Sequence, residues 1–372
     1  MWLKLVNRRK SRYIFLIFLF AGCVEPYDFV IVDKEPRLVI EGTISDKSYN
    51  ETLLYPSDGR RFSVKLTYTS NVSNERVQPV SDASVVLLDD LSTSIAYAEV
   101  QSGLYEIMDP DFKAVPERAY KLQVKLSNDE IYESSWERLP EYEPLPVGEI
   151  GFSETEKVTY QYVEKEKKVK TIKGIDVFVQ VPTRNQGQTT YYRWDYSTHW
   201  IFIAPLPPVF SPVKKCWVAG THYLSDFRLL ADHVGGYNAN LFFMPTEGNE
   251  RILEDFTVLV RQKILSEDYF NFLREMQEQD QNFLHSDRPP YNLKTNFTAV
   301  SGGRDPIGYF AVTGEEATRW YFNVDDLSYA VPNNLRQGCQ GPPPFVPPPG
   351  CNSCIEYQFG LATNVEPDWW RD

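Results

Sequence analysis

Tyr192-Arg-Trp-Asp-Tyr-Ser-Thr-His-Trp-Ile-Phe202 is the stretch of sequence that says most about the fold. Side chains of a β-strand alternate between the two faces of a sheet, so this stretch would separate aromatic rings from mostly polar groups. The aromatic face would hold Tyr192, Trp194, Tyr196, Trp200 and Phe202, and the opposite face Arg193, Asp195, Ser197, His199 and Ile201. This period of two predicts a strand in an amphipathic sheet.

The aromatic face of this strand has two possible roles. In the first, the rings pack into a hydrophobic core. In the second, Tyr192, Trp194, Tyr196 and Trp200 form a platform for a ligand, because aromatic rings stack on sugars and clamp peptides. Burial of Trp194 and Trp200 between sheets would argue against the platform.

The sequence around this strand predicts a larger β-rich domain over residues 149–338. Most of its apolar runs are short and alternate, as strands do. One segment, near 266–283, has helical spacing instead, with apolar residues at i, i+3, i+4 and i+7: Tyr269, Phe272, Leu273 and Met276. Ser266 is suited to cap the first turn of this amphipathic helix.

The preceding part of the chain, residues 37–138, has at least five short alternating stretches separated by turn residues, the clearest being 120–126. This pattern predicts a β-sandwich of the immunoglobulin-like or carboxypeptidase-regulatory-like kind. Residues 139–148 contain three prolines and are expected to form an extended linker. The expected fold class is therefore mostly β: a sandwich, then the larger β-rich domain with one helix.

The first 22 residues are typical of an export signal. A basic start is followed by the uncharged run 13–20, whose eight residues are far fewer than the ~20 of a membrane-spanning helix. The small pair Ala21-Gly22 precedes Cys23, as in bacterial lipoprotein signals that are cleaved before a lipidated cysteine. We expect a signal peptide over 1–22, lipid attachment at Cys23 and a tether over 23–36.

Charge limits the classes of partner. Without residues 1–22 the chain keeps 33 basic and all 51 acidic side chains, a formal charge of −18. Nucleic-acid binding requires a basic surface, so no nucleic-acid partner is expected. Adsorption to anionic lipid is equally disfavoured, and membrane attachment should depend on acyl chains at Cys23.

The other cysteines are Cys216, Cys339, Cys351 and Cys354. An even number in an exported chain predicts two disulfides, for which three connectivities are possible. The Cys351-x-x-Cys354 spacing also occurs in zinc sites, but the other two cysteines lack such spacing. We expect disulfides to hold the Cys- and Pro-rich tail, residues 339–372, and we expect no metal.

Catalytic motifs are absent from the sequence. The four histidines, His199, His222, His233 and His285, form no HExxH or HxH motif, and the chain has no GxSxG, P-loop or GxGxxG pattern. We therefore expect neither an enzyme nor a cofactor.

Several blocks together resemble one family, the Bacteroidetes lipoproteins grouped as domain of unknown function 4249. The matching blocks are Cys23-Val-Glu-Pro-Tyr, Leu38-Val-Ile-Glu-Gly42, Tyr192-Arg-Trp194, Lys215-Cys-Trp-Val218, Val260-Arg-Gln262 leading to Ser266-x-x-x-Phe270, Ile307-Gly-Tyr-Phe-Ala311, and a tail ending Pro367-Asp-Trp-Trp370. The resemblance implies an outer-membrane lipoprotein that is often encoded near TonB-dependent receptors. It supplies no catalytic residues.

These observations lead to one expected function and one alternative. We expect a non-catalytic accessory protein of the outer membrane, anchored through Cys23 and facing the cell surface, that works with the barrel of a TonB-dependent transporter in ligand capture or uptake. The alternative is a free-standing glycan- or protein-binding adhesin that uses the aromatic face around Trp194 and Trp200.

Overall fold

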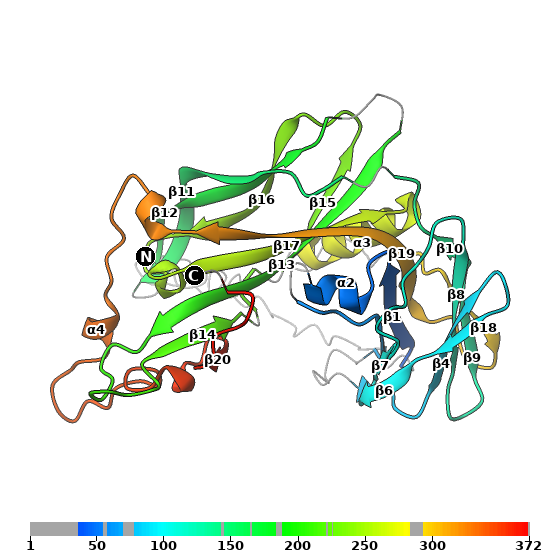
Figure 1. Ribbon diagram of the computed structural model, residues 1–372, viewed down its shortest axis with the longest axis horizontal. Coiled ribbons are helices and arrows are strands. Elements are labelled where there is room, and N and C mark those ends of the chain that lie inside the picture. Colours follow the sequence, from blue (N-terminus) through cyan, green and yellow to red (C-terminus); the bar gives the residue numbers. More distant parts are fainter. Residues whose placement is uncertain are drawn as a thin grey trace, which may run out of the picture. The chain divides into compact units, whose positions relative to one another are not determined.

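The computed structural model describes residues 36–54, 58–69, 78–142, 145–163, 166–183, 188–220, 222–224, 226–282 and 293–370. The predicted signal peptide, Cys23 and the tether up to residue 35 lie outside these ranges. The described residues from Arg37 onward belong to one compact unit. Their mostly-β architecture, shown in Figure 1, confirms the predicted fold class.

The largest sheet has eleven strands: β1 Leu38–Ser45, β2 Ser63–Tyr68, β3 Gln78–Pro79, β6 Ala98–Gln101, β7 Leu104–Glu106, β13 Thr190–Ile203, β14 Lys215–Ala219, β15 Arg228–Asp232, β17 Phe256–Leu265, β19 Ile307–Phe322 and β20 Leu361–Thr363. Nine of them follow the order β20-β14-β13-β17-β19-β1-β2-β7-β6, with β15 beside β13 and β3 beside β2. The quoted aromatic stretch is therefore the middle of β13, flanked by strands on both edges.

Two smaller sheets accompany it. The first contains β4 Ser84–Asp89, β5 Ser94–Ala96, β8 Ala119–Lys125, β9 Ile131–Ser134, β10 Glu137–Arg138 and β18 Phe297–Ser301. The second contains β11 Ile150–Val163, β12 Glu166–Val181 and β16 Tyr237–Pro245. The helices are α2 Tyr49–Leu54, α3 Glu267–Asn282 and α4 Leu335–Gly338, with short 3₁₀ turns η2 Glu250–Ile252, η3 Val324–Asp326 and η4 Cys354–Glu356.

The N-terminal core lies between the β1-β2-β7 part of the large sheet and the sheet containing β4, β8 and β9. Alternate residues of each strand meet there, including Ile40, Leu66, Leu87 and Leu122. Strands β18 and β19, from beyond the predicted linker, also contribute to this core through Phe297, Phe310 and Val312. The sandwich strands of residues 37–138 are thus completed by the C-terminal part of the chain.

The connection between these distant parts is a parallel ladder of β1 with β19, in which Val39 faces Ile307 and Thr43 faces Ala311. Gly308 has φ +120°, and a Cβ at this position would lie 2.0 Å from the carbonyl oxygen of Ile40. Only glycine fits such a close approach of two backbones. This explains the glycine in the Ile307-Gly-Tyr-Phe-Ala311 block.

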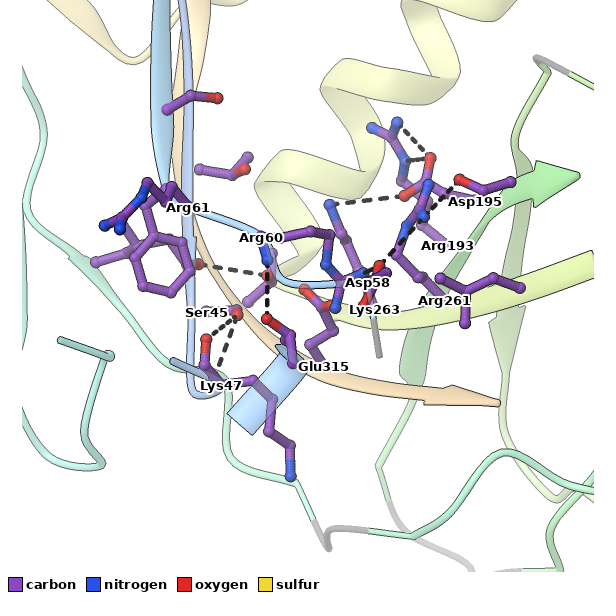
Figure 2. Close-up of a pocket in the computed structure, with 18 of the residues that line it drawn as sticks. Ser45, Lys47, Asp58, Arg60, Arg61, Arg193, Asp195, Arg261, Lys263 and Glu315 are labelled. Carbon is purple, nitrogen blue, oxygen red and sulfur yellow. Dashed lines mark hydrogen bonds and ion pairs between the residues drawn. The ribbon is translucent and has the colours of Figure 1, made fainter. Parts of the chain in front are cut away.

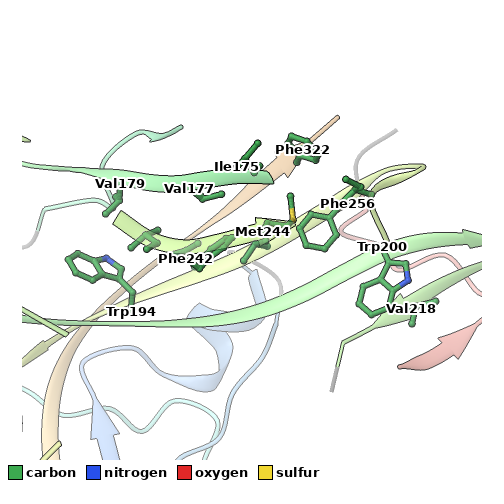
Figure 3. Close-up of a cluster of buried hydrophobic side chains, with 14 of the residues drawn as sticks. Ile175, Val177, Val179, Trp194, Trp200, Val218, Phe242, Met244, Phe256 and Phe322 are labelled. Atoms are coloured by element: carbon green, nitrogen blue, oxygen red, sulfur yellow. The ribbon is translucent and has the colours of Figure 1, made fainter. Parts of the chain in front are cut away.

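The second core lies between β13, β17 and β14 of the large sheet and the three-stranded sheet (Figure 3). Trp194 of β13 lies near Val179 of β12, while Trp200 of the same strand lies beside Val218 of β14 and packs against the rings of Tyr223 and Tyr357. Since the aromatic residues of β13 face this core, the polar residues of the same strand face the other side of the sheet.

Helix α3 matches the helix predicted near 266–283. Ser266 accepts the backbone N–H of Tyr269 at 3.3 Å through its Oγ, as an N-cap does. Tyr269, Phe272 and Leu273 pack against Tyr309 of β19 and Leu265 of β17, so the apolar stripe of the helix covers this part of the sheet. The short helices α2 and α4 have no clear apolar period in the sequence.

Candidate functional site

A cavity of about 640 Å³ lies against the polar face of β13 (Figure 2). Three neighbouring strands form its floor. In the ladders Arg193 of β13 faces Lys263 of β17, and Lys263 faces Glu315 of β19. Two residues further along β13, Asp195 faces Arg261. Because paired residues project from the same face, the register brings these charges together.

The other walls come from segments far away in sequence. Asp58, Arg60 and Arg61 belong to the connection between α2 and β2, and Lys47 follows β1. Trp369, in the C-terminal tail, closes one end. Its ring packs edge-on against His199 at 4.8 Å and lies 3.4 Å beneath the guanidinium carbon of Arg319.

Asp195 is the centre of one ion-pair group. Arg193 donates to its Oδ1 from Nε at 2.9 Å and from Nη2 at 2.7 Å, while the Lys263 ammonium lies 3.6 Å from Oδ2. Burial alone would raise the pKa of Asp195, but Lys263 and Arg193 outweigh it and hold this pKa below the ordinary value. Asp195 is therefore a fixed negative charge at neutral pH and not a proton donor.

A second group surrounds Asp58. Arg60 lies 3.2 Å from Asp58 and also pairs with Glu315, and Arg261 lies 3.8 Å from Asp58. Arg261 donates from Nη1 to Ser197 Oγ at 2.7 Å. Arg261 belongs to both groups, because it is opposite Asp195 in the β13–β17 ladder and also lies close to Asp58.

Positive charge is in excess in this cavity, although the whole chain has a formal charge of −13. Its lining contains three carboxylates, Asp58, Asp195 and Glu315. The same lining contains seven cationic side chains, namely Lys47, Arg60, Arg61, Arg193, Arg261, Lys263 and Arg319. Burial lowers the pKa of Lys263 and of Arg261 and brings that of Arg319 to about 10. The charged forms are thus less favourable here than in water.

The His199 side chain adds a pH response to this site. Burial, with a smaller contribution from Arg319, lowers its pKa to about 4. The unfolded chain, with a pKa near 6.5, therefore takes up a proton at His199 between about pH 6.5 and 4 that the folded chain does not. Stability is present in full above about pH 6.5 and should fall by up to about 3 kcal/mol by pH 4.

The His199→Phe variant tests this expectation, because phenylalanine keeps the ring contact with Trp369 but does not titrate. Urea unfolding measured at pH 7, 5.5 and 4.5 should lose less stability in this variant than in the unmodified protein. The exposed His222, replaced in the same way, is the matched control. Equal pH slopes in all three proteins would contradict the assignment.

The predicted ligand-platform residues do not line this cavity, because they lie on the opposite face of β13. Tyr192, Trp194 and Trp200 are 3 %, 1 % and 0 % exposed, and Tyr196 packs edge-on against Phe242 at 4.9 Å. Trp194 also donates from Nε1 to Oε1 of Gln262 at 3.1 Å. These four rings pack into the second core and leave no exposed platform. The three-stranded sheet contributes to their burial through Phe242, and Trp200 is covered by Tyr223 and by Tyr357 of the C-terminal tail.

The four predicted disulfide cysteines are paired as Cys216–Cys354 and Cys339–Cys351. The first bond joins the tail to β14, and the second closes the proline-rich segment between its two cysteines. Among the residues that the structure describes, no group of three or more His, Cys, Asp or Glu side chains could hold a metal ion. Within the same ranges, no helix is long and apolar enough to cross a bilayer.

The cavity residues were missed by sequence reasoning, although one signal for them exists. The polar face of the 192–202 stretch contains Arg193, Asp195, Ser197 and His199, and all four line the cavity. When the aromatic side of a strand is buried, its charged side must face either solvent or a polar site. The partners Lys263, Glu315 and Asp58 could not be assigned without the register.

The fold and the site together define a mostly-β protein with a ligand-sized, positively charged cavity. The chain belongs to the family described as "Domain of unknown function (DUF4249)", whose model matches residues 24–319. No curated protein and no solved structure matches the chain. Blocks that carried the resemblance pair directly in the sheet. Val39–Gly42 pair with Ile307–Phe310 through β1 and β19, and Tyr192–Trp194 pair with Gln262–Ile264 through β13 and β17.

Proposed function

We propose that the protein is a non-catalytic, lipid-anchored accessory protein of the outer membrane that captures a ligand beside a TonB-dependent transporter. The cavity carries the binding part of this proposal, since about 640 Å³ is within the range of small-molecule sites, roughly 300–1,000 Å³. The lipoprotein signal ending at Cys23 supports the anchor. The Bacteroidetes family resemblance supports the outer membrane and the transporter.

A partner surface is available on the proline-rich loops. Phe210 is 99 % exposed at the tip of the 205–212 loop, and Val346 is exposed in the 341–350 segment. The 205–212 loop is linked to Cys351, the residue that follows the 341–350 segment, by a hydrogen bond from the backbone N–H of Leu206 to the Cys351 carbonyl at 2.9 Å. A contact with the transporter at these loops would remove both apolar side chains from water, which is favourable.

An adhesin is the less favoured alternative. It was expected to bind through the rings of Tyr192, Trp194, Tyr196 and Trp200, and these rings lie in the core. An adhesin would therefore need a different surface, for which no residue pattern has been identified.

The test is recovery of partners from native outer membranes after mild crosslinking of the tagged full-length protein. We expect one transporter barrel to be enriched about tenfold or more over an unrelated tagged lipoprotein. The Cys23→Ser variant should lose its acyl chains, leave the membrane fraction and recover little of the barrel. Phe210→Ser should remain in the membrane fraction and recover less barrel if the proline-rich loops make the contact.

Two outcomes would contradict the proposal. One is a membrane-anchored protein that recovers no barrel at all. The other is mass spectrometry of the mature amino terminus that finds no acyl groups on Cys23, with membrane association unchanged in Cys23→Ser.

A further inference from the structure

We propose that the cavity binds an anion with two or more carboxylate or phosphate groups, and that Arg261 and Lys263 contact it directly. This inference rests on the ligand-capture part of the proposed function and names the chemical class of the ligand. It does not depend on the identity of the transporter.

The first argument is the imbalance of charge. The cavity lining has three carboxylates and seven cationic side chains in a space partly withdrawn from water. Two of the cations have other partners, because Lys47 pairs with Glu316 at 2.8 Å and Arg61 donates to the backbone carbonyls of Ile107 and Met108. The remaining five cationic side chains share the three carboxylates. Buried or partly buried charges are normally paired, because the loss of hydration is otherwise uncompensated. The rest of the protein has the opposite sign of charge, so the cationic cavity is not a by-product of composition. A bound anion would supply the missing counter-charge.

The second argument is that Lys263 and Arg261 still have hydrogen-bond donors to offer. Lys263 lies 3.6 Å from Asp195 Oδ2, which is beyond hydrogen-bond distance, and its ammonium has three N–H donors. Arg261 uses one nitrogen on Ser197 and lies 3.8 Å from Asp58, while a guanidinium has five N–H donors. The Lys263 side chain is 19 % exposed, which leaves it accessible at the cavity wall.

The third argument concerns the number of anionic groups. Lys263 faces Glu315, and Arg319 lies four residues further along the same strand, β19. Four residues of β-strand span roughly 13 Å. The cations are therefore distributed along the cavity instead of converging on one point, as they would for a single monovalent ion. A ligand with two or more separated acidic groups matches this distribution.

The experiment uses isothermal titration calorimetry on the purified full-length mature protein. Citrate probes for carboxylates, pyrophosphate for phosphates, and glucose is the neutral control. We expect at least one of the two anions to bind with one-to-one stoichiometry and glucose to give no binding. The tighter of the two anions identifies the acidic group that the cavity prefers.

The variant Lys263→Met should reduce the affinity for that anion about tenfold or more, the loss expected for a charge-assisted hydrogen bond. Asp195 keeps its two hydrogen bonds from Arg193 in this variant, so the fold should persist. The matched control is Lys121→Met, because Lys121 is 18 % exposed and pairs with Glu133 at 2.6 Å, far from the cavity. Its anion affinity should remain unchanged.

The inference is overturned if neither anion binds more tightly than glucose, or if Lys121→Met and Lys263→Met reduce affinity equally. A melting curve of each variant shows whether it is folded. If Lys263→Met does not fold, Arg261→Gln replaces it as the test, with the same expected loss. Recovery of a transporter without anion binding would overturn this inference alone, whereas anion binding without a transporter would overturn only the accessory role.

Discussion

Replacing Trp200 by alanine should lower the free energy of unfolding by about 3–5 kcal/mol, the usual cost of truncating a large buried aromatic side chain. Trp200 is fully buried and contacts the rings of Tyr223 and Tyr357 edge-on at 6.4 and 6.2 Å. Its removal would leave a cavity between β13 and the segments that carry Tyr223 and Tyr357, which the surrounding side chains cannot fill. Urea or guanidinium unfolding, followed by circular dichroism, measures the loss.

Trp136→Ala is the control for this prediction. The same residue type is 49 % exposed at this position and lies beside Lys121 at the surface. Its truncation should cost less than about 1 kcal/mol, as surface substitutions usually do. Equal losses at the two positions would mean that the aromatic face of β13 is not a core face.

Removal of the Cys216–Cys354 disulfide should have the second large effect. This bond joins residues 138 positions apart, and the loop-entropy relation gives a stabilisation of about 5 kcal/mol for such a loop. The double variant Cys216→Ala, Cys354→Ala should accordingly unfold at a much lower denaturant concentration. Alanine is suitable because both cysteines are fully buried and a hydroxyl group would introduce an unpaired polar atom.

The second disulfide provides an internal comparison. Cys339–Cys351 closes a loop of only 12 positions, for which the same relation gives about 3 kcal/mol. The variant Cys339→Ala, Cys351→Ala should therefore be the more stable of the two double variants. The reverse order would show that the tail does not stabilise β14 through Cys354.

The alternation in the 192–202 stretch was sufficient to predict the strand and its two faces, because a two-residue period follows from backbone geometry alone. The helix at 267–282 was predictable for the same kind of reason, since its apolar residues repeat with the helical period and Ser266 caps it. Such local patterns also gave the mostly-β class.

The candidate site was not predictable, because its residues depend on which strands are neighbours. Asp58 and Arg60 belong to a connection without any period, and Glu315 is the partner of Lys263 only through the β17–β19 register. The pairing of β1 with β19 joins strands about 270 positions apart, for example Val39 with Ile307. No local signal in the sequence specifies a contact at that separation.

This pairing has a consequence for how the protein reaches its destination. Arg37 and Asp305, 268 positions apart, are joined by side-chain to backbone hydrogen bonds beside the first strand. The proposed export would deliver the chain amino terminus first. One edge of β1 could then pair early with β2, but the other edge would stay uncovered until residues 307–313 of β19 have been translocated. Long-range pairing of this kind is slow, and an uncovered strand edge invites aggregation in the meantime. Under the proposed export, periplasmic chaperones that shield such edges would therefore matter more for this protein than for one whose first strand pairs only with its sequence neighbours.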